Sequence, residues 1–296
     1  MLLYFEDQTK AARALAETAG TAHHCIEIHR FPDGEVRLRL PAQLPERVTV
    51  FRSLHHPNEK LVELLLAART ARTLGARHLT LVAPYLAYMR QDMAFTPGEA
   101  VSQGIVGNFL ATLFDAAITV DPHLHRVATL AEAMPLADAV VLTGAAVLSD
   151  LIVRSRQRPL LVGPDEESAQ WVAVAARRHG LDHAVCHKVR HGDRDVSVAL
   201  EGVDVAGRAV VIMDDVGSTG NTLAGAARLL REGGALSIDA AVTHALFGPG
   251  ALETVRAAGV DQIWSTDCIA HPTNAVSMAP LIAAALADLR GAAERS

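Results

Sequence analysis

Hydrophobic and polar residues alternate along this chain in blocks that suggest strands and helices in turn. Short runs of Val, Ile and Leu are separated by longer stretches, rich in Ala, Leu and Arg, that have a helical period. The clearest blocks lie at 48–53, 59–74, 79–84, 139–143, 159–163, 208–213, 222–232 and 237–243. Strands that alternate with helices are typical of parallel sheets with helices packed on them. The pattern therefore predicts the α/β fold class.

A faint internal repeat suggests that the chain contains this arrangement twice. An Ala-Ala-Arg triplet at 67–69 precedes a Gly-Ala pair at 75–76, and the same spacing separates the triplet at 226–228 from the pair at 234–235. Both copies read as a strand, a loop, a helix and a Gly-terminated turn, at an offset of 159 residues. Because a recurring pattern of this kind indicates a repeated structural unit, we expect two similar domains.

The length of the chain supports the same division. Its 296 residues, about half of them hydrophobic, exceed the usual size of one domain. We predict an N-terminal domain at 1–146 and a C-terminal domain at 147–296, each a mostly parallel sheet flanked by helices. A last helix, at about 278–290, could pack back on the N-terminal domain.

Charge and cysteine content exclude several classes of protein. The formal net charge is −6, from 27 Lys and Arg against 33 Asp and Glu, which argues against a general affinity for nucleic acids or anionic membranes. Cys25, Cys186 and Cys268 are far apart and lack metal-ligand spacing, so neither disulfides nor structural zinc is indicated. No apolar run reaches the roughly 18 residues that span a bilayer. We expect a soluble, cytoplasmic protein without a signal peptide, a membrane segment or a nucleic-acid partner.

The most informative local pattern is the segment 210–222, an apolar strand ending in two acids, then a loop of small residues and a helix. A loop at a helix N-terminus offers unpaired N–H groups and the positive end of the helix dipole to a phosphate. Asp214 and Asp215, at the carboxyl end of the strand, could accept hydrogen bonds from ribose hydroxyls or assist a metal. The loop residues of this predicted sugar-phosphate site are Ser218, Thr219, Gly220, Asn221 and Thr222.

Other phosphate-binding patterns are missing from this segment. It lacks the GxxxxGK[ST] pattern of a Walker A turn and the GxGxxG pattern of a dinucleotide site. Taken alone, it could also be an ordinary acidic turn between a strand and a helix, with a Thr cap.

In its wider context, the segment 210–222 resembles the phosphoribosyl-diphosphate loop shared by type I phosphoribosyltransferases and ribose-phosphate pyrophosphokinases, also called phosphoribosyl pyrophosphate synthetases. Seven further segments look like synthetase motifs, in the synthetase order, and the transferases lack the first four. They are 31–35, 56–64, 84–92, 119–123, 163–165, 188–190 and 204–208. The resemblance covers nearly the whole chain, and the segment 97–102 looks more like the short archaeal-type synthetases.

The resemblance implies two type I phosphoribosyltransferase-like domains and a defined reaction. The diphosphoryl group of ATP is transferred to the 1-hydroxyl of ribose 5-phosphate, giving 5-phosphoribosyl 1-diphosphate and AMP, with Mg²⁺ as cofactor. In such a step the protein mainly positions the reactants and stabilises the transition-state charge with cations. A homo-oligomer is also implied, because the family's ATP site is shared between subunits.

The resemblance assigns roles to individual residues. Lys188 and Arg190 match the family's catalytic Lys-x-Arg on a mobile loop, where they would clamp the transition-state charge. His123 and Asp165 match the ligands of the ATP-bound Mg²⁺, although oxygen donors are the commoner magnesium ligands. The residues that match ATP-binding positions are Arg90, Gln91 and Asp92 in one loop, and Phe31, Asp33 and Glu35 in a hairpin that reaches the ATP of a neighbouring subunit.

Three positions depart from the family pattern. Asn221 stands where the loop usually has a second glycine, and Asn is the next best tolerated residue if φ is positive. Met93 replaces a basic residue near the expected triphosphate. Glu166 adds negative charge beside the expected metal.

Two other functions fit parts of the sequence. A catalytically inactive, synthetase-associated regulatory subunit would keep the fold, but the retention of all four catalytic-type and metal-type positions argues against it. A phosphoribosyltransferase would explain the segment 210–222 but would leave residues 1–145 without a role. Without the resemblance, Lys188 and Arg190 would be interpreted as solvated basic residues, and 31–35 as a Pro-Asp-Gly turn.

Overall fold

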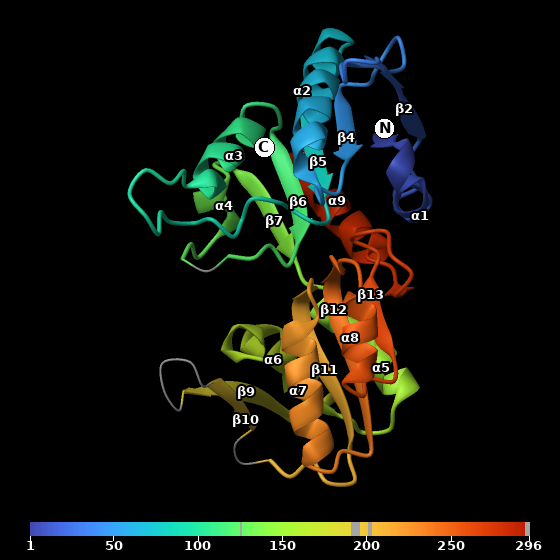
Figure 1. Cartoon of the computed structure of the whole chain (residues 1–296). Helices are drawn as coiled ribbons and strands as arrows, with labels where there is room; N and C mark the ends of the chain where they lie inside the picture. Colours follow the sequence, from blue (N-terminus) through green and yellow to red (C-terminus); the bar gives the residue numbers. More distant parts are fainter. Residues whose placement is uncertain (125, 191–195, 201–202, 294–296) are drawn as a thin grey trace. The chain divides into compact units, whose positions relative to one another are not determined.

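The computed structural model of the chain is shown in Figure 1. It describes the backbone of residues 1–124, 126–190, 196–200 and 203–293, and the side chains of all of these except 188–190, 196–199 and 292–293. The chain forms two compact units. Within the part of the chain that is described, none of the helices is both long and apolar enough to cross a lipid bilayer.

The division between the units lies four residues before the predicted boundary at 146/147. Unit 1 contains Met1–Leu142 and the segment from Met278 onward, and unit 2 contains Thr143–Ser277. The difference arises because helix α5 (Ala145–Ser155) packs on α6 (Ala169–His179) and therefore belongs wholly to unit 2.

The last helix of the chain packs on the N-terminal unit. Helix α9 (Ala279–Ala293) contacts α1 (Thr9–Thr18) and the strands β6 (Ala116–Val120) and β7 (Asp138–Leu142). The N-terminal unit is therefore completed by residues from the far end of the sequence.

Unit 1 is built on one sheet of seven strands. The strands are β1 (Leu2–Phe5), β2 (His23–Arg30), β3 (Val36–Arg39), β4 (Arg47–Phe51), β5 (His78–Ala83), β6 and β7. Their order is β3-β2-β1-β4-β5-β6-β7, and all pairs are parallel except β2 with β3. The other helices are η1 (Glu6–Gln8), α2 (Pro57–Thr73), α3 (Ser102–Ala111) and α4 (Leu130–Ala133). Figure 1 shows α2 in front of the sheet and α9 behind it.

Unit 2 also has a seven-stranded sheet. Its strands are β8 (Leu160–Gly163), β9 (His183–Arg190), β10 (Val196–Leu200), β11 (Ala209–Gly217), β12 (Ser237–Ala245), β13 (Ile263–Thr266) and β14 (Asn274–Val276). Their order is β10-β9-β8-β11-β12-β13-β14, with β9 and β10 antiparallel. The other helices are η2 (Glu166–Ser168), α7 (Asn221–Glu232) and α8 (Ala251–Ala257).

The two sheets share one topology, because β8 to β14 repeat the order of β1 to β7. The repeated triplets at 67–69 and 226–228 lie on corresponding helices, α2 and α7. In each unit the strand order reverses at one place, between β1 and β4 and between β8 and β11. Open α/β sheets bind ligands at such switch points, outside the carboxyl ends of the strands.

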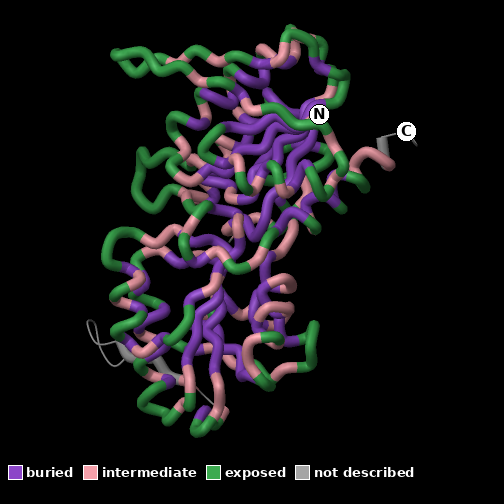
Figure 2. The backbone as a smooth tube through the Cα atoms, turned by 90° about the vertical axis from the view of Figure 1, so that its right-hand side faces the viewer, coloured by how far each residue is buried: buried purple, intermediate pink, exposed green. Residues whose placement is uncertain are grey.

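Burial follows the layers of each unit. Every residue of β1, β6 and β8 is buried, as expected for parallel strands that are covered on both faces. Figure 2 shows buried backbone concentrated in the sheets and exposed backbone along the outer loops. The β2–β3 hairpin is different, since Ile26 is the one buried residue of β2 and β3 has none.

Candidate active site

The predicted phosphate turn joins β11 to the N-terminus of α7. Gly220, the N-cap of α7, has a φ of 79°, and a Cβ atom there would lie 2.8 Å from Val255 Cγ2 and 2.9 Å from the Ala251 carbonyl oxygen. Glycine alone fits this approach without a shift of its neighbours. Asn221 is the first helical residue and does not have a positive φ. The left-handed conformation thus falls on Gly220, and the substitution at Asn221 introduces no backbone strain.

Hydroxyl side chains surround this helix N-terminus. Ser218 is half-buried, and Thr219 and Thr222 are exposed. The Asn221 N–H donates to Thr219 Oγ1 at 3.4 Å, and the Ser218 carbonyl accepts from the Gly248 N–H at 3.2 Å. Ser218 and Thr219 line a cavity of about 380 Å³ together with residues between Leu246 and Thr254. The turn therefore presents N–H and O–H donors beside open space, as an anion site requires.

Three carboxylates lie at the switch point of unit 2. Asp214 and Asp215 are near the carboxyl end of β11, and Asp165 follows the neighbouring strand β8. The Asp215 N–H donates to Asp214 Oδ1 at 2.9 Å. Burial, reinforced by the charges of Asp215 and Asp165, raises the pKa of Asp214 well above its ordinary value. A cation or a set of hydroxyl donors would relieve this accumulation of negative charge.

Asp165 is held in place by a local turn. It is the N-cap of η2, and its N–H donates to Ser168 Oγ at 3.4 Å. Behind this turn, Glu166 Oε1 lies 3.3 Å from His187 Nδ1 on β9. The negative charge that the sequence predicted beside the metal site thus faces a histidine.

Asp165 also influences a buried cysteine. Burial, followed by the charge of Asp165, raises the pKa of the Cys186 thiol to about 11. Cys186 therefore remains a protonated thiol at neutral pH, which makes it a poor metal ligand or nucleophile.

Lys188 and Arg190, the predicted catalytic pair, are described by their backbone alone. Both belong to β9, opposite Val198 and Val196 of β10. Their backbone therefore lies in a strand pair, where the resemblance implied a loop. Their side chains lie outside the described residues.

The two predicted magnesium ligands belong to different units, His123 to unit 1 and Asp165 to unit 2. His123 is half-buried and follows the buried Asp121 and Pro122. Within the described part of the chain, no three His, Cys, Asp or Glu side chains are grouped so that they could hold a metal ion.

Strained backbone gathers at the carboxyl edge of the unit 1 sheet. His56 (φ 51°), Tyr88 (φ 66°) and Asp121 (φ 37°) have positive φ without being glycine. They lie in the loops that follow β4, β5 and β6, three adjacent strands. Residues held in such conformations cluster at functional sites, so this edge is the candidate ligand-binding edge of unit 1.

The predicted ATP triplet lies in the loop after β5. Arg90 is exposed, and Gln91 Nε2 donates to the Met93 carbonyl at 3.0 Å. The Asp92 side chain is only 2% exposed, and its Oδ1 accepts from Arg126 Nη1 at 2.7 Å. Within the described structure, Asp92 Oδ2 is buried and has no hydrogen-bond partner.

Internal bonds shape the rest of this loop. The Phe95 N–H donates to Glu99 Oε2 at 2.8 Å, a bond that, with those from Thr96, lowers the pKa of Glu99. Gln103 Nε2 donates to the Met89 carbonyl at 3.0 Å. The triplet is therefore presented by a loop with a defined conformation.

The predicted adenine-binding residues occupy the tip of the β2–β3 hairpin. The turn is closed by the Phe31 N–H, which donates to the Glu35 carbonyl at 2.8 Å, and by the Glu35 N–H, which donates to Asp33 Oδ1 at 3.1 Å. The Phe31 ring stands edge-on to His29, with centroids 4.7 Å apart, and Phe31 is 40% exposed. Asp33 and Glu35 are exposed. The hairpin thus presents an aromatic ring and two acids outward from the core.

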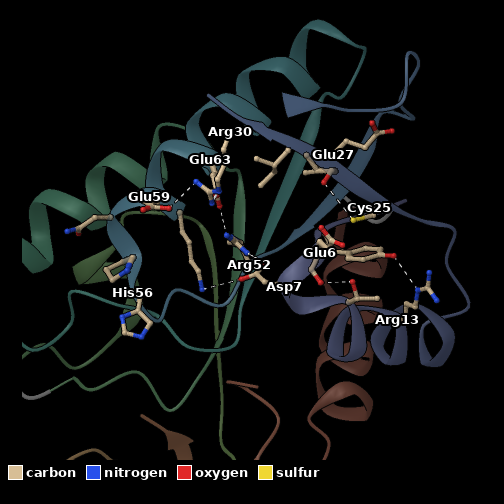
Figure 3. Close-up of a pocket in the computed structure, with 17 residues that line it drawn as sticks. Glu6, Asp7, Arg13, Cys25, Glu27, Arg30, Arg52, His56, Glu59 and Glu63 are labelled. Carbon is tan, nitrogen blue, oxygen red and sulfur yellow. Dashed lines mark hydrogen bonds and ion pairs between the residues drawn. The ribbon is translucent and has the colours of Figure 1, made fainter. Parts of the chain in front are cut away.

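The switch point of unit 1 carries a feature that the sequence did not suggest. A cavity of about 1560 Å³ there is lined by β2, η1, the loop after β4 and the start of α2 (Figure 3). Arg52, only 3% exposed, donates to both Asp7 and Glu63. Arg30 binds Glu59 at 3.0 Å and Glu63 at 2.9 Å. Side chains of unit 1 itself therefore pair opposite charges in this crevice. We call these five residues the ion-pair cluster.

One further cation, Lys60, extends the ion-pair cluster. Lys60 Nζ lies 3.7 Å from Asp7 Oδ2 and donates to the Ser53 carbonyl at 3.0 Å. Burial, followed by the charge of Arg52, lowers the pKa of Lys60 to about 8. The signal in the sequence was the placement of Lys60 and Glu63 on the buried face of α2, in register with Leu64 and Ala67.

Comparison with known proteins covers the same two units. Residues 1–113 match the N-terminal domain of ribose phosphate pyrophosphokinase, and residues 138–263 match the phosphoribosyl transferase domain. The ribose-phosphate pyrophosphokinase of Methanopyrus kandleri is 35% identical over 98% of this chain and 100% of its own length. The chain belongs to the ribose-phosphate pyrophosphokinase family. This family is one of enzymes, and the resemblance stated from the sequence motifs is confirmed.

Two further comparisons agree with this assignment. The ribose-phosphate pyrophosphokinase of Methanosarcina acetivorans is 34% identical over 95% of each chain. The crystal structure of phosphoribosylpyrophosphate synthetase from Mycobacterium smegmatis superposes with a TM-score of 0.83, covering 100% of this chain and 99% of that one, at 24% identity. The structural likeness supports the predicted fold of two phosphoribosyltransferase-like units.

Proposed function

We propose that this member of the ribose-phosphate pyrophosphokinase family transfers the diphosphoryl group of ATP to the 1-hydroxyl of ribose 5-phosphate, with Mg²⁺. The observation that carries the proposal is the turn in unit 2. There the N-terminus of α7, where only glycine fits at position 220, follows shortly after Asp214 and Asp215. A phosphate and a pair of ribose hydroxyls are the groups that such a pair of subsites would bind.

Ribose 5-phosphate would bind at unit 2. Its phosphate would accept hydrogen bonds from N–H groups at the start of α7 and from the hydroxyls of Ser218, Thr219 and Thr222, around Gly220 and Asn221. The ribose hydroxyls would donate to Asp214 and Asp215. Because an ionised Asp214 is unfavourable in the free protein, these donors would stabilise it on binding.

ATP would bind through elements of unit 1. Arg90, Gln91 and Asp92 would hold the nucleotide from the loop after β5. Phe31, Asp33 and Glu35 would serve the ATP of a second copy, because the hairpin holds an exposed ring and two exposed acids outside the core of its own unit. The proposal therefore includes a homo-oligomer.

Mg²⁺ would be held by His123 and Asp165 together with ATP phosphate oxygens. Mg²⁺ is usually bound by one or two protein carboxylates plus substrate phosphates, so Asp165 suits it, and a pre-formed cage of three protein ligands is not required. When bound, the ion would neutralise negative charge on the phosphates.

The transfer itself needs positioning and charge stabilisation. The oxygen of the sugar's 1-hydroxyl attacks the β-phosphorus of ATP and loses its proton, the bond from the β-phosphorus to the bridging oxygen breaks, and AMP leaves with that oxygen. Lys188 and Arg190 would stabilise the charge on the transferred group. A contact made mainly in the transition state raises turnover without tightening sugar binding.

The test is AMP release from ATP and Mg²⁺, with and without ribose 5-phosphate, with the sugar product identified by mass. We expect AMP that depends on the sugar, together with a diphosphorylated pentose. Lys188→Ala should lower turnover by orders of magnitude and leave the Kd for ribose 5-phosphate nearly unchanged. Binding of both substrates without turnover would refute the proposal and indicate the inactive regulatory subunit.

A further inference from the structure

Arg126 is a cation that the fold brings to the predicted ATP triplet from a separate loop. It follows β6, and its Nη1 donates to Asp92 Oδ1 at 2.7 Å across 34 residues of sequence. Its guanidinium carbon lies 5.9 Å from the centre of the Phe95 ring. The guanidinium is therefore positioned by a charge-assisted hydrogen bond to Asp92 and by the Phe95 ring.

The two side chains of this ion pair differ in their exposure to solvent. The Asp92 side chain is 2% exposed, whereas that of Arg126 is 52% exposed. A guanidinium has five N–H donors, and Asp92 accepts from one nitrogen of Arg126. The remaining donors of Arg126 therefore face a partly open surface next to the triplet.

The loop that contains residues 90–92 has few positive charges of its own, so the place of Arg126 beside it matters. Arg90 is the one Lys or Arg between residues 78 and 125, and Met93 and Phe95 in the same loop are uncharged. The loop also contains the acids Asp92 and Glu99. A polyphosphate is strongly anionic, and Arg90 is the one cationic side chain that this loop itself supplies for it. Arg126 is the next Lys or Arg in the sequence, and the fold returns it to this loop.

We propose that Arg126 binds the polyphosphate of the nucleotide donor, with Asp92 and Phe95 holding its guanidinium in position. The proposal deepens the proposed function and rests on it, because it takes the loop at 90–92 to be the ATP site. The competing role is structural, in which the pair only secures the loop.

Titration with ATP and with adenosine, in the absence of ribose 5-phosphate, separates the two roles. Arg126→Gln should weaken ATP binding about 10- to 100-fold, the range for a lost charge-assisted hydrogen bond. Adenosine, which has no phosphate, should bind the variant as it binds the wild-type chain. Arg126→Lys should retain part of the ATP affinity, because it keeps the charge without the planar fork.

Two further variants complete the test. Arg77→Gln is the matched control, because Arg77 lies in unit 1 and is 82% exposed in a pair with Glu46 at 3.4 Å, at the other end of β5. It should leave ATP binding unchanged. Met93→Arg in the Arg126→Gln background should restore part of the ATP affinity by returning a cation to the same loop.

The results of these titrations separate a failure of the Arg126 proposal from a failure of the proposed function. Unchanged ATP affinity in Arg126→Gln would overturn the proposal, and so would an equal loss for ATP and adenosine, which would indicate that the loop had changed shape. If the wild-type chain bound no ATP, the proposed function itself would be refuted.

Discussion

The two units share one strand order, yet their switch points differ in charge. At β8 and β11, the carboxylates of Asp165, Asp214 and Asp215 lie together, and burial, reinforced by the charges of the other two, raises the pKa of Asp214. At β1 and β4, the buried Arg52 is paired with Asp7 and Glu63. The difference teaches that one strand order can either pair opposite charges at its switch point or bring like charges together there. The crevice lined by the three carboxylates is the candidate sugar-phosphate site.

The two units also differ in which residues have a positive φ at the carboxyl edges of their sheets. Unit 2 has Gly220 as the left-handed residue of the predicted phosphate turn, where the absence of a side chain leaves the backbone accessible. Unit 1 places His56, Tyr88 and Asp121 in that region, and these residues carry side chains at the cost of strain. At this edge, the turn of unit 2 thus has a glycine in the left-handed conformation, whereas the loops of unit 1 have residues with side chains there.

The largest effect is expected from opening the ion-pair cluster. Arg52→Ala leaves Glu63, which is 1% exposed, with Arg30 as its remaining ion-pair partner in that cluster, and should lower the free energy of unfolding by about 3–5 kcal/mol. Arg77→Gln, at an exposed pair in the same unit, should cost less than about 1 kcal/mol. Hydrogen exchange of the β1 and β4 amides would locate the loss in unit 1. Equal losses in the two variants would contradict a structural role for the ion-pair cluster.

Adding a methyl group at the phosphate turn should have the next largest effect. Gly220→Ala combines a left-handed conformation with contacts at 2.8 and 2.9 Å, and should cost about 2–4 kcal/mol. Gly180→Ala is the control, because its φ is 62° and nothing lies within 4 Å of the added Cβ, so about 1–2 kcal/mol is expected. Thermal unfolding of both variants measures the difference. A Gly220→Ala loss no greater than the control would show that the approach to Val255 and Ala251 is easily relaxed.

Replacing Asp214 by a neutral residue should raise the stability of the protein, whereas the two changes above lower it. Its folded-state pKa is raised, so its ionised form costs stability, and this cost grows as pH rises from the ordinary pKa to the raised one. Asp214→Asn, which mimics the protonated acid, should therefore raise Tm at neutral pH by about 2–4 °C while weakening ribose 5-phosphate binding. Asp7→Asn in unit 1 should lower Tm, because it removes a partner of Arg52. A fall of Tm in Asp214→Asn would contradict the contrast between the crevices.

The smallest effect is expected at an exposed ion pair of unit 2. Bonds from Arg178, and then from His179, lower the pKa of Asp150 to about 2 from an ordinary 3.8. The stability that Asp150 gains from these bonds is therefore fully present above its ordinary pKa and is lost as the pH falls through about 2. Asp150→Asn should cost less than about 1 kcal/mol at pH 7, because the pair is exposed to solvent. Chemical unfolding of the wild-type chain and of Asp150→Asn should show a smaller difference in the free energy of unfolding at pH 3 than at pH 7. An equal difference at the two pH values would refute the lowered pKa of Asp150.

Local features of the site were predictable, and long-range ones were not. The segment 210–222 was interpreted as strand, loop and helix, because turn residues and hydrophobic period act over a few positions. The sequence also indicated the hairpin turn at 31–35. The pairs Arg52–Asp7 and Arg126–Asp92 join residues 45 and 34 positions apart, and no local pattern encodes such a contact.

The sequence by itself determined the α/β class, the duplication, the strand, loop and helix at 210–222 and the family, because these depend on local periodicity and on motifs in a constant order. Only the tertiary structure decided the division after Leu142, the docking of α9 on unit 1, the ion-pair cluster and the placement of Arg126 beside Asp92. The physical reason is that strand order and helix docking bring together residues that loops separate in the sequence. Whether a charge is neutralised is therefore known only once the chain has folded.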